Sequence, residues 1–451
     1  MNIQLNKQPS SIITWLKTYA NRRMLVVFLL GFSSGLPIAL VGGTLQAWFK
    51  TNGAGIILIG FISLLGQPYS YKFLWAPLLD RFAPTSLMDR RRGWMLLTQL
   101  LIISLIITMS AFKPDAVVKL FNLQIPTLLL LGLLLSCCSA TQDIAIDAYK
   151  IEVLKHDERG LGSALGVEGY RVAMIASGGF ALTLADKYGW QTTYLIMAGL
   201  MLFGIIATLF APPVTVQLDK NQTKLVALIS KSLKDFLTRD KAWLILLLLI
   251  LYKLGDAFSH TLSSTFLLDL GFALKEVGMI NKVLGVVATL IGVFVGGLFM
   301  TRVGLFKALL TFGILAAITN LSYMLLAITG KHMLVACAAV FVENICAGMG
   351  TAAFVSLIMS LCSPNYTATQ FALFSSLSAV GRIYVGPVAG YLVQATGWVG
   401  LYLFSAVIAL PGLVLLVYLR RQIISRDDDK QQQASDTDTA SDTDSKGLQA
   451  A

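Results

Sequence analysis

The chain contains 451 residues, of which 56% are hydrophobic and only 13% are charged, and its mean hydropathy is +0.73. A soluble domain carries about 25% charged residues, because it must cover its apolar interior with polar side chains. The formal net charge of +11 is spread over separate segments and forms no single basic face, which argues against a nucleic-acid surface. The composition therefore excludes a soluble fold and predicts an all-α protein that crosses the lipid bilayer several times.

Twelve apolar runs are long enough to cross a membrane, since a spanning helix needs about 20 mostly apolar residues. The runs are continuous and do not alternate with polar residues, which favours helices over membrane β-strands. The predicted spans are 24–48, 56–79, 93–112, 126–149, 160–185, 190–211, 242–268, 276–301, 306–328, 332–361, 366–394 and 398–419.

The distribution of basic residues predicts the orientation of these spans. If the N-terminus is cytoplasmic, 24 of the 35 Lys and Arg residues lie on the cytoplasmic side and six lie on the opposite side. Such a bias is the positive-inside pattern, and an even number of spans returns the C-terminus to the same side. The polar start of the chain leads into an apolar run too long for a signal peptide, so we expect that run to remain as a membrane anchor.

A weak internal repeat indicates two related halves. The sequence around Arg171 and the sequence around Arg382 share a Gly, an Arg, a helix of small residues, a Gly-Trp pair and a Tyr. Two six-helix bundles related by an axis along the membrane normal would leave such a repeat. The expected parts are a cytoplasmic N-terminal segment (1–23), an N-terminal bundle (24–211), a cytoplasmic linker (212–241), a C-terminal bundle (242–420) and a disordered acidic tail (421–451).

Ionisable side chains occur at membrane depth, where each costs about 3 kcal/mol or more unless it is paired or faces water. Five cations and five anions lie inside the predicted spans, so the interior is neutral if all are ionised. These residues are Lys72, Asp143, Asp147, Glu168, Arg171, Lys253, Asp256, Lys282, Glu343 and Arg382.

Three cations near the middle of their spans would suit an anionic solute, because Arg presents a planar fork of donors to a carboxylate. Aromatic side chains in the spans could stack on sugar rings, although packing and interfacial anchoring are their commoner roles. The substrate-binding candidates are Arg171, Lys253, Arg382, Tyr170, Tyr252 and Gln142.

Carboxylates in the same central set, Asp256, Glu343 and Glu168, are the proton-coupling candidates, because burial favours the protonated form of a carboxyl group. The hypothesis from the residues alone is proton-coupled import of a polar anion. The alternative is that the central charges only neutralise one another and hold the helices in register.

Charges toward the predicted cytoplasmic ends form a second set, which we interpret as ion pairs that form a gate and open by re-pairing. The loop after the second predicted span reads Ala-Pro-Leu-Leu-Asp-Arg and is followed by three arginines. It partly resembles the Gly-x-Leu-Ala-Asp-Arg loop of the major facilitator architecture, without the first Gly. The gate and loop candidates are Asp80, Arg81, Arg90, Arg91, Arg92, Lys72, Asp143 and Asp147.

Pairs of glycines four residues apart predict close approach of helices. They occur at Gly31 and Gly35, Gly162 and Gly166, Gly292 and Gly296, and Gly386 and Gly390.

Several long segments, in the same order, resemble the AmpG-type muropeptide permeases, a branch of the major facilitator superfamily. The likeness runs from about residue 24 to residue 420. In the first half the segments are GFSSGLPIALVGGTLQAWF, YKFLWAPLLDR, RRRGW, SATQDIAIDAYK and ERGLGSALGVEGYR. In the second half they are AWLILLLLILYKLGDAF, NKVLG, VFVENICAGMGTAAF and TATQFALFSSLSAVGRIYVGPVAG.

The resemblance implies an inner-membrane permease of a Gram-negative bacterium that uses the proton motive force. Its cargo would be N-acetylglucosaminyl-1,6-anhydro-N-acetylmuramyl peptides, which are imported from the periplasm for recycling of the cell wall. In many relatives this import also feeds the signal that induces a β-lactamase. The expected partners are this substrate, protons and the lipid bilayer, with no nucleic acid, and we expect the chain to act as a monomer.

Other functions remain open on the sequence alone. A related permease could carry another organic anion such as an acyl-coenzyme A, and a membrane-embedded transferase or a non-transporting sensor is a further alternative. We expect no catalytic residues, no cofactor and no metal. The chain has no ATP-binding loop of the Gly-x-x-x-x-Gly-Lys-Ser/Thr type, and His156, His260 and His332 are too scattered for a metal site.

Overall fold

The computed structural model describes residues 21–85, 88–120, 123–154, 159–214, 236–362 and 367–424. Residues 425–451 of the tail predicted to be disordered, nearly all of the N-terminal segment and most of the central linker lie outside these residues. The first residues of the predicted tail, 421–424, are helical. Within the described ranges, nine helices are long and apolar enough to cross a membrane. The structure is thus all-helical apart from one short hairpin.

The chain forms two compact units. Unit 1 comprises Met1–Leu218 and Leu267–Val283, and unit 2 comprises Asp219–Phe266 and Leu284–Ala451. The short segment Leu267–Val283, which joins two apolar runs of the second half of the sequence, therefore belongs to unit 1.

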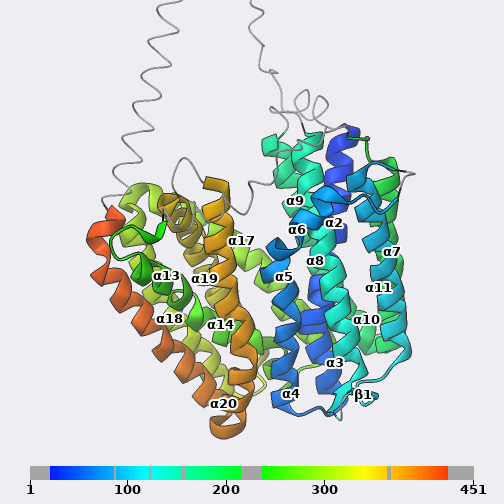
Figure 1. The fold of residues 1–451 in the computed structure, drawn as a ribbon. Helices are drawn as coiled ribbons and strands as arrows, with labels where there is room; N and C mark the ends of the chain where they lie inside the picture. The colour runs from blue at the N-terminus through cyan, green and yellow to red at the C-terminus, as the bar shows by residue number, and fades with distance from the viewer. Residues whose placement is uncertain are drawn as a thin grey trace, which may run out of the picture. The chain divides into compact units, whose positions relative to one another are not determined.

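Unit 1 is built of helices that run side by side, several of them interrupted by tighter or wider turns (Figure 1). Its helices are α2 (Arg22–Ala39), η1 (Leu40–Thr44), α3 (Leu45–Thr51), α4 (Ile56–Phe61), η2 (Ile62–Gly66), α5 (Gln67–Tyr71), η3 (Lys72–Leu74), α6 (Ala76–Arg81), α7 (Arg90–Ala111), α8 (Thr127–Val153), α9 (Arg159–Met174), η4 (Ile175–Phe180), α10 (Ala181–Tyr188), α11 (Trp190–Phe210), α16 (Leu274–Val277) and η6 (Gly278–Leu284).

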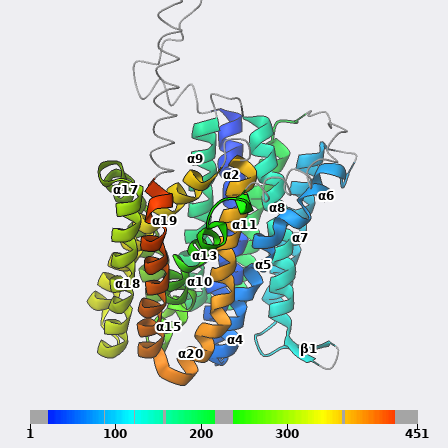
Figure 2. The same ribbon diagram turned by 60° about the vertical axis from the view of Figure 1, so that its left-hand side comes forward.

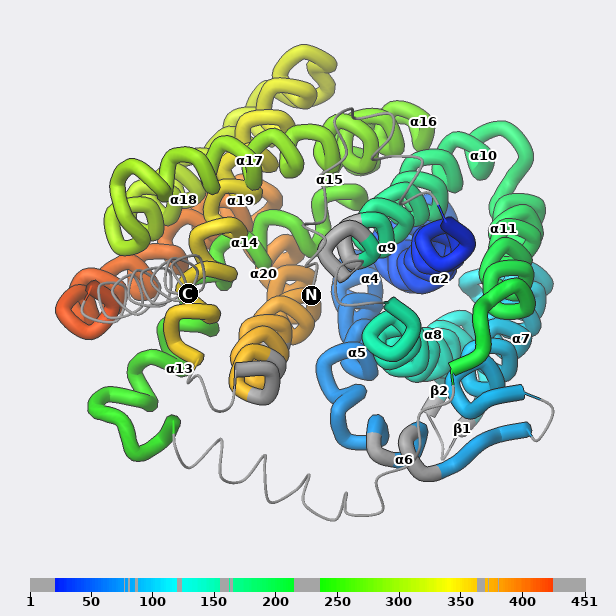
Figure 3. The backbone as a smooth tube through the Cα atoms, turned by 90° about the horizontal axis from the view of Figure 1, so that it is seen from above, coloured from blue at the N-terminus to red at the C-terminus, as the bar shows by residue number. Residues whose placement is uncertain are grey.

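Helices α2 and α9 pack tightly along their length, and both lie near α8 (Figure 3). A Cβ atom on Gly31 would overlap the backbone carbonyl of Gly166, and a Cβ on Gly35 would meet the backbone of Tyr170. Only glycine lets two backbones approach this closely. The structure therefore confirms the close approach that the glycine pairs in these two segments predict.

The second predicted span is broken into α4, η2, α5, η3 and α6. Pro68 stands in the first turn of α5 and Pro77 in the first turn of α6. Proline has no backbone N–H to donate and is best placed where a helix starts. The apolar run 56–79 hence forms short helical pieces, which the hydropathy of the sequence does not reveal.

Three π-helical segments, η1, η4 and η6, occur in unit 1. The hydroxyl of Thr44 in η1 donates to the carbonyl of Ser177 in η4 at 2.7 Å. The side chain of Lys282 in η6 covers Gly178 and Gly179 of η4, where an added Cβ would lie 3.0 Å and 3.2 Å from its methylene carbons. Small residues in η4 thus make room for both neighbouring segments.

A two-stranded antiparallel hairpin, β1 (Val117–Leu120) and β2 (Leu123–Pro126), connects α7 and α8. Val117 pairs with Pro126 and Leu120 with Leu123. The hairpin lies at the end of unit 1 opposite to α6 (Figure 2). The sequence analysis did not predict it, because a strand pair this short leaves little pattern in the sequence.

Unit 2 packs its helices around an apolar core that includes Leu248, Phe312 and Phe354. Glycines again set the closest contact, since a Cβ on Gly292 in α17 would overlap the carbonyl of Ile345 in α19. Its helices are α13 (Ala242–Leu251), α14 (Leu254–Thr261), α15 (Ser263–Asp269, which continues into unit 1), α17 (Gly285–Val303), α18 (Leu305–Thr329), α19 (Met333–Leu361) and α20 (Thr367–Tyr418).

The last helical run of unit 2 is interrupted at a glycine. The run α20 covers both of the last two predicted spans and is interrupted at Gly397, whose φ of 73° only glycine adopts without strain.

Large apolar side chains on unit 2, such as Trp243, Phe294 and Leu334, are 70%, 69% and 76% exposed. Outward apolar side chains of this kind are expected where the surrounding solvent is lipid.

Candidate functional site

The break between α13 and α14 places two predicted site residues in contact. The ammonium of Lys253 lies 3.0 Å from a carboxylate oxygen of Asp256, and the same ammonium donates to the hydroxyl of Thr351 at 3.2 Å. The two charged side chains are only 19% and 16% exposed. Because they are three residues apart around the start of α14, they face one way, as the spacing predicts. The two side chains therefore form a half-buried ion pair within unit 2.

A small pocket opens beside this pair. The residues that line it are Tyr252, Lys253, Asp256, Phe312, Gly313, Ala316, Gly350, Ala409 and Leu413.

Tyr252, a substrate-binding candidate, is held mainly by packing. Its hydroxyl donates to the carbonyl of Leu309 at 2.9 Å, and its ring stacks on Phe354 with centroids 5.6 Å apart. A phenol whose hydroxyl and ring already have protein partners has little left to offer a ligand.

A second buried pair lies at the other end of α14. The Nε2 atom of His260 is 2.7 Å from Oε1 of Glu343, whose side chain is 2% exposed, whereas the imidazole is 36% exposed. Glu343 is a predicted proton-coupling residue, whereas His260 is rejected on the sequence as a metal ligand and given no other role. The signal that could have found it is its position four residues after Asp256, which places both on one face of a helix.

Glu168 and Arg171 on α9 have no ion pair among the described residues. Glu168 is exposed, and Arg171 and Tyr170 are half-buried, although α9 packs closely on α2. Glu168 and Arg171 are three residues apart, yet they form no ion pair within the described part of the chain. Within the described ranges, no neighbouring ion neutralises either charge.

Two further substrate candidates differ sharply in exposure. Arg382 on α20 is exposed and likewise has no hydrogen bond or ion pair in the described ranges. Gln142 on α8 is fully buried, and its amide nitrogen donates to the hydroxyl of Ser33 on α2 at 3.0 Å. Its observed contact thus joins two helices of unit 1.

The gate candidates Lys72, Asp143 and Asp147 come together between η3 and α8. The ammonium of Lys72 lies 3.5 Å from Asp147 and 4.0 Å from Asp143. Asp147 also pairs with Lys150 at 3.3 Å, and Asp143 accepts a hydrogen bond from the hydroxyl of Ser34 on α2. One lysine shared between two aspartates is a network in which partners can be exchanged.

The loop candidates form a second network at the start of α7. Two nitrogen atoms of Arg91 donate to one carboxylate oxygen of Glu152 on α8, at 3.0 Å and 2.8 Å. Arg92 pairs with Asp89, the N-cap of α7, and also donates to the carbonyl of Ala211 at 2.9 Å. These arginines therefore tie α7 to α8 and to the end of α11.

Three loop candidates have less described geometry. Arg90 begins α7, while Asp80 and Arg81 end α6 and their side chains lie outside the described part of the structure.

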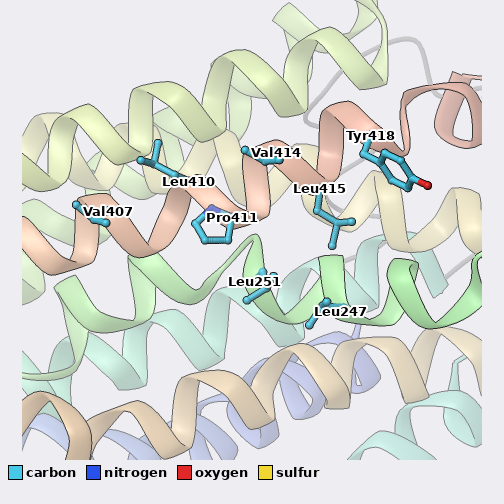
Figure 4. A pocket seen from close by; sticks show the side chains of 8 residues that line it. All are labelled: Leu247, Leu251, Val407, Leu410, Pro411, Val414, Leu415 and Tyr418. Atoms are coloured by element: carbon cyan, nitrogen blue, oxygen red, sulfur yellow. The ribbon is translucent and has the colours of Figure 1, made fainter.

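A second hollow in unit 2 is apolar. It is a groove of about 640 Å³ between α13 and α20, with no ionisable group except a tyrosine (Figure 4). A groove of this kind cannot satisfy the polar groups of a charged solute. The residues that line it are Leu247, Leu251, Val407, Leu410, Pro411, Val414, Leu415 and Tyr418.

Comparison with known proteins gives a family and a fold. The model of the family described as Major Facilitator Superfamily matches residues 23–386. An anhydromuropeptide permease of Escherichia coli K12 is 50% identical over 411 residues, which cover 91% of this chain and 82% of the relative. A "putative transporter AmpG 4" of Rickettsia conorii is 35% identical over 90% of this chain and 99% of its own length.

Solved structures show the same fold at low sequence identity. A nucleoside transporter superposes with a TM-score of 0.68 at 15% identity, covering 88% of this chain and 99% of its own. A D-xylose-proton symporter superposes with a TM-score of 0.67 at 13% identity, covering 88% of this chain and 96% of its own.

Proposed function

Because the chain belongs to the major facilitator superfamily, and within it to the family of the anhydromuropeptide permeases, we propose that it imports anhydromuropeptides. The cargo would be N-acetylglucosaminyl-1,6-anhydro-N-acetylmuramyl peptides, carried from the periplasm to the cytoplasm with protons. The observation that carries this proposal is 50% identity to the Escherichia coli permease over 91% of the chain. Likeness of this length covers both halves of the sequence and extends well beyond the features that all facilitator proteins share.

The charges on the described helices support a solute of this chemistry. The cargo joins a polar disaccharide to peptide carboxylates, and Arg171 and Arg382 are cations without a protein partner in the described ranges. A guanidinium offers two parallel donors to one carboxylate. We assign the peptide carboxylates to Arg171, Arg382 and Lys253, and the transported proton to carboxylates among Asp256, Glu343 and Glu168.

The wider setting follows from the same proposal. We propose twelve spans in two six-helix bundles, with both termini in the cytoplasm and the chain in the inner membrane. The excess of Lys and Arg in the loops assigned to the cytoplasm supports this orientation. The import would supply cell-wall fragments for recycling and for the induction of β-lactamase, and the working unit would be a monomer.

The direct test is uptake by the purified chain in proteoliposomes. A labelled anhydro-disaccharide peptide should accumulate inside when the outside is more acidic, and collapse of the proton gradient should abolish the accumulation. Recovery of the label in chemically unchanged form would exclude a transferase. Binding without accumulation would indicate a sensor and would contradict the proposal.

Competition distinguishes the proposed cargo from other anions. An excess of unlabelled anhydro-disaccharide peptide should abolish uptake of the label, whereas a coenzyme A ester should leave it unchanged. The reverse pattern would identify a permease for acyl-coenzyme A. Uptake of the disaccharide without its peptide would show that the carboxylates of the peptide are not required.

A further inference from the structure

The contact between His260 and Glu343 requires a hydrogen atom between Nε2 and Oε1. A neutral imidazole nitrogen without hydrogen and an ionised carboxylate are both acceptors, and two acceptors repel each other. Their separation of 2.7 Å is that of a hydrogen bond. A neutral imidazole meets this requirement when Nε2 carries its hydrogen and donates it to the ionised carboxylate, and the pair then has a charge of −1. A second proton, on Nδ1, makes the pair neutral.

Neighbouring helices hold Glu343 in this position. The amide of Asn344 donates to its second oxygen, Oε2, at 3.2 Å, and the hydroxyl of Thr289 on α17 donates to the oxygen of the same amide at 3.2 Å. Without the added proton on Nδ1, the buried carboxylate is left with neutral donors alone. Such a charge is costly at this depth.

Other ionisable groups face the pair from four elements. Lys253, the nearest cation, is already paired with Asp256, one turn before His260. Tyr323 lies close enough to Glu343 and Asn344 to interact with both, though without hydrogen-bond geometry. Among the described residues these groups are Lys253 and Asp256 at the start of α14, Tyr323 on α18, Cys346 on α19 and Tyr402 on α20.

The exposure of the two partners differs in a way that suits proton entry. The imidazole is 36% exposed and the carboxylate 2%, so the histidine is the more accessible of the two. Tyr323 and Tyr402 are fully buried and stack on each other with centroids 5.2 Å apart. These two buried rings lie near the carboxylate of Glu343, and the imidazole is the accessible partner of the pair.

We propose that His260 and Glu343 together form the site that carries the transported proton, an inference that rests on the proposed function. A proton from water binds at Nδ1 of His260, and the charge of the pair changes from −1 to 0 while Nε2–H stays bonded to the carboxylate. Glu343 holds the proton through the hydrogen bond while the substrate crosses. Separation of the two side chains in the opposite state returns the proton to water on the other side.

The test uses the full-length chain in proteoliposomes with labelled anhydro-disaccharide peptide. In the unchanged chain, an outside acidic by one pH unit should drive about tenfold accumulation for each proton carried. Glu343→Gln and His260→Gln should each abolish this accumulation. Both should retain exchange of external label for internal unlabelled substrate within about threefold, since exchange needs no net movement of protons.

Controls separate a proton site from a structural pair. His332→Gln alters an exposed histidine just before α19 and should keep the full response to the gradient. If a single variant does not fold, the double variant His260→Gln/Glu343→Gln restores a neutral hydrogen-bonding pair and replaces it in both assays. A pH titration of substrate affinity between about pH 6 and 8 should show a slope in the unchanged chain and a flat line in the variants.

Three results would overturn the inference. Gradient-driven accumulation by both variants would show that the proton binds elsewhere. Loss of exchange together with accumulation, in variants with unchanged unfolding temperature, would show that the pair is needed for passage of the substrate. Absence of gradient-driven accumulation in the unchanged chain would overturn the proposed function itself, and the inference with it.

Discussion

The ion pair between Lys253 and Asp256 gives a prediction whose size can be worked out from the structure. At 3.0 Å and an effective dielectric constant of about 20, the attraction is about 5 kcal/mol, part of which repays the removal of both groups from water. Removal of one partner leaves the other charge half-buried. We expect Lys253→Met and Asp256→Asn each to lower the free energy of unfolding by about 2–3 kcal/mol.

The double variant provides the decisive comparison. With both charges gone, no unpaired ion remains, so the loss should be about 1 kcal/mol relative to the unchanged chain. The coupling free energy from the double-mutant cycle would then be about 3–5 kcal/mol. Thr351→Val is a matched control, because it removes a neutral partner of the same ammonium, and it should cost about 1 kcal/mol.

The assay is reversible unfolding of the purified chain in bicelles, followed by uptake in proteoliposomes. Two additive single-variant losses, with coupling below about 0.5 kcal/mol, would refute the argument that the two charges stabilise each other. The uptake measurement separates stability from binding. If Lys253 also holds a substrate carboxylate, uptake should remain low in the double variant even though its stability recovers.

Three other variants test single contacts. Gly31→Leu should prevent assembly of α2 against α9, because the side chain would overlap the backbone of Gly166, and we expect loss of folded protein in size-exclusion chromatography. Arg91→Met should lower the free energy of unfolding by about 2 kcal/mol, because Glu152 loses two charged hydrogen bonds, and Glu152→Gln in the same background should recover part of the loss. Tyr252→Phe should cost about 1 kcal/mol in the same unfolding assay and leave uptake unchanged, since its hydroxyl binds a backbone carbonyl.

Features that depend on local sequence were predictable. Long apolar runs predict helices because a membrane interior leaves no other partner for the backbone. The spacing of Gly31 and Gly35 predicts a close helix contact, and it forms against Gly166. The spacing of Lys253 and Asp256 predicts a shared helix face, and they form an ion pair. In each case the residues that decide the contact lie within one or two turns of each other.

Spacing alone does not guarantee a contact, as α9 shows. Glu168 and Arg171 have the same separation as Lys253 and Asp256 but form no ion pair in the described structure. The difference lies in their surroundings. Glu168 is exposed, so it can lose little by facing away from its neighbour.

Contacts between distant parts of the chain were not predictable from one sequence. His260 and Glu343 are 83 residues apart, and their contact depends on the rotation and depth of two helices relative to each other. Ser34 and Asp143, and Arg91 and Glu152, are pairs of the same kind. A carboxylate at membrane depth does predict that some partner exists, but hydropathy and spacing do not identify it.

The charges of the described structure divide according to their partners. Every charge on α14 and on the part of α19 that it contacts is paired, since Lys253 meets Asp256 and His260 meets Glu343. A paired charge is satisfied without a solute, and its removal disturbs the protein first. By contrast, Arg171 on α9 and Arg382 on α20 have no partner in the described ranges. These two arginines therefore gain most from an arriving anion. We therefore expect changes at the two arginines to act mainly on substrate affinity, and changes at the pairs to act on stability and on coupling to the proton gradient.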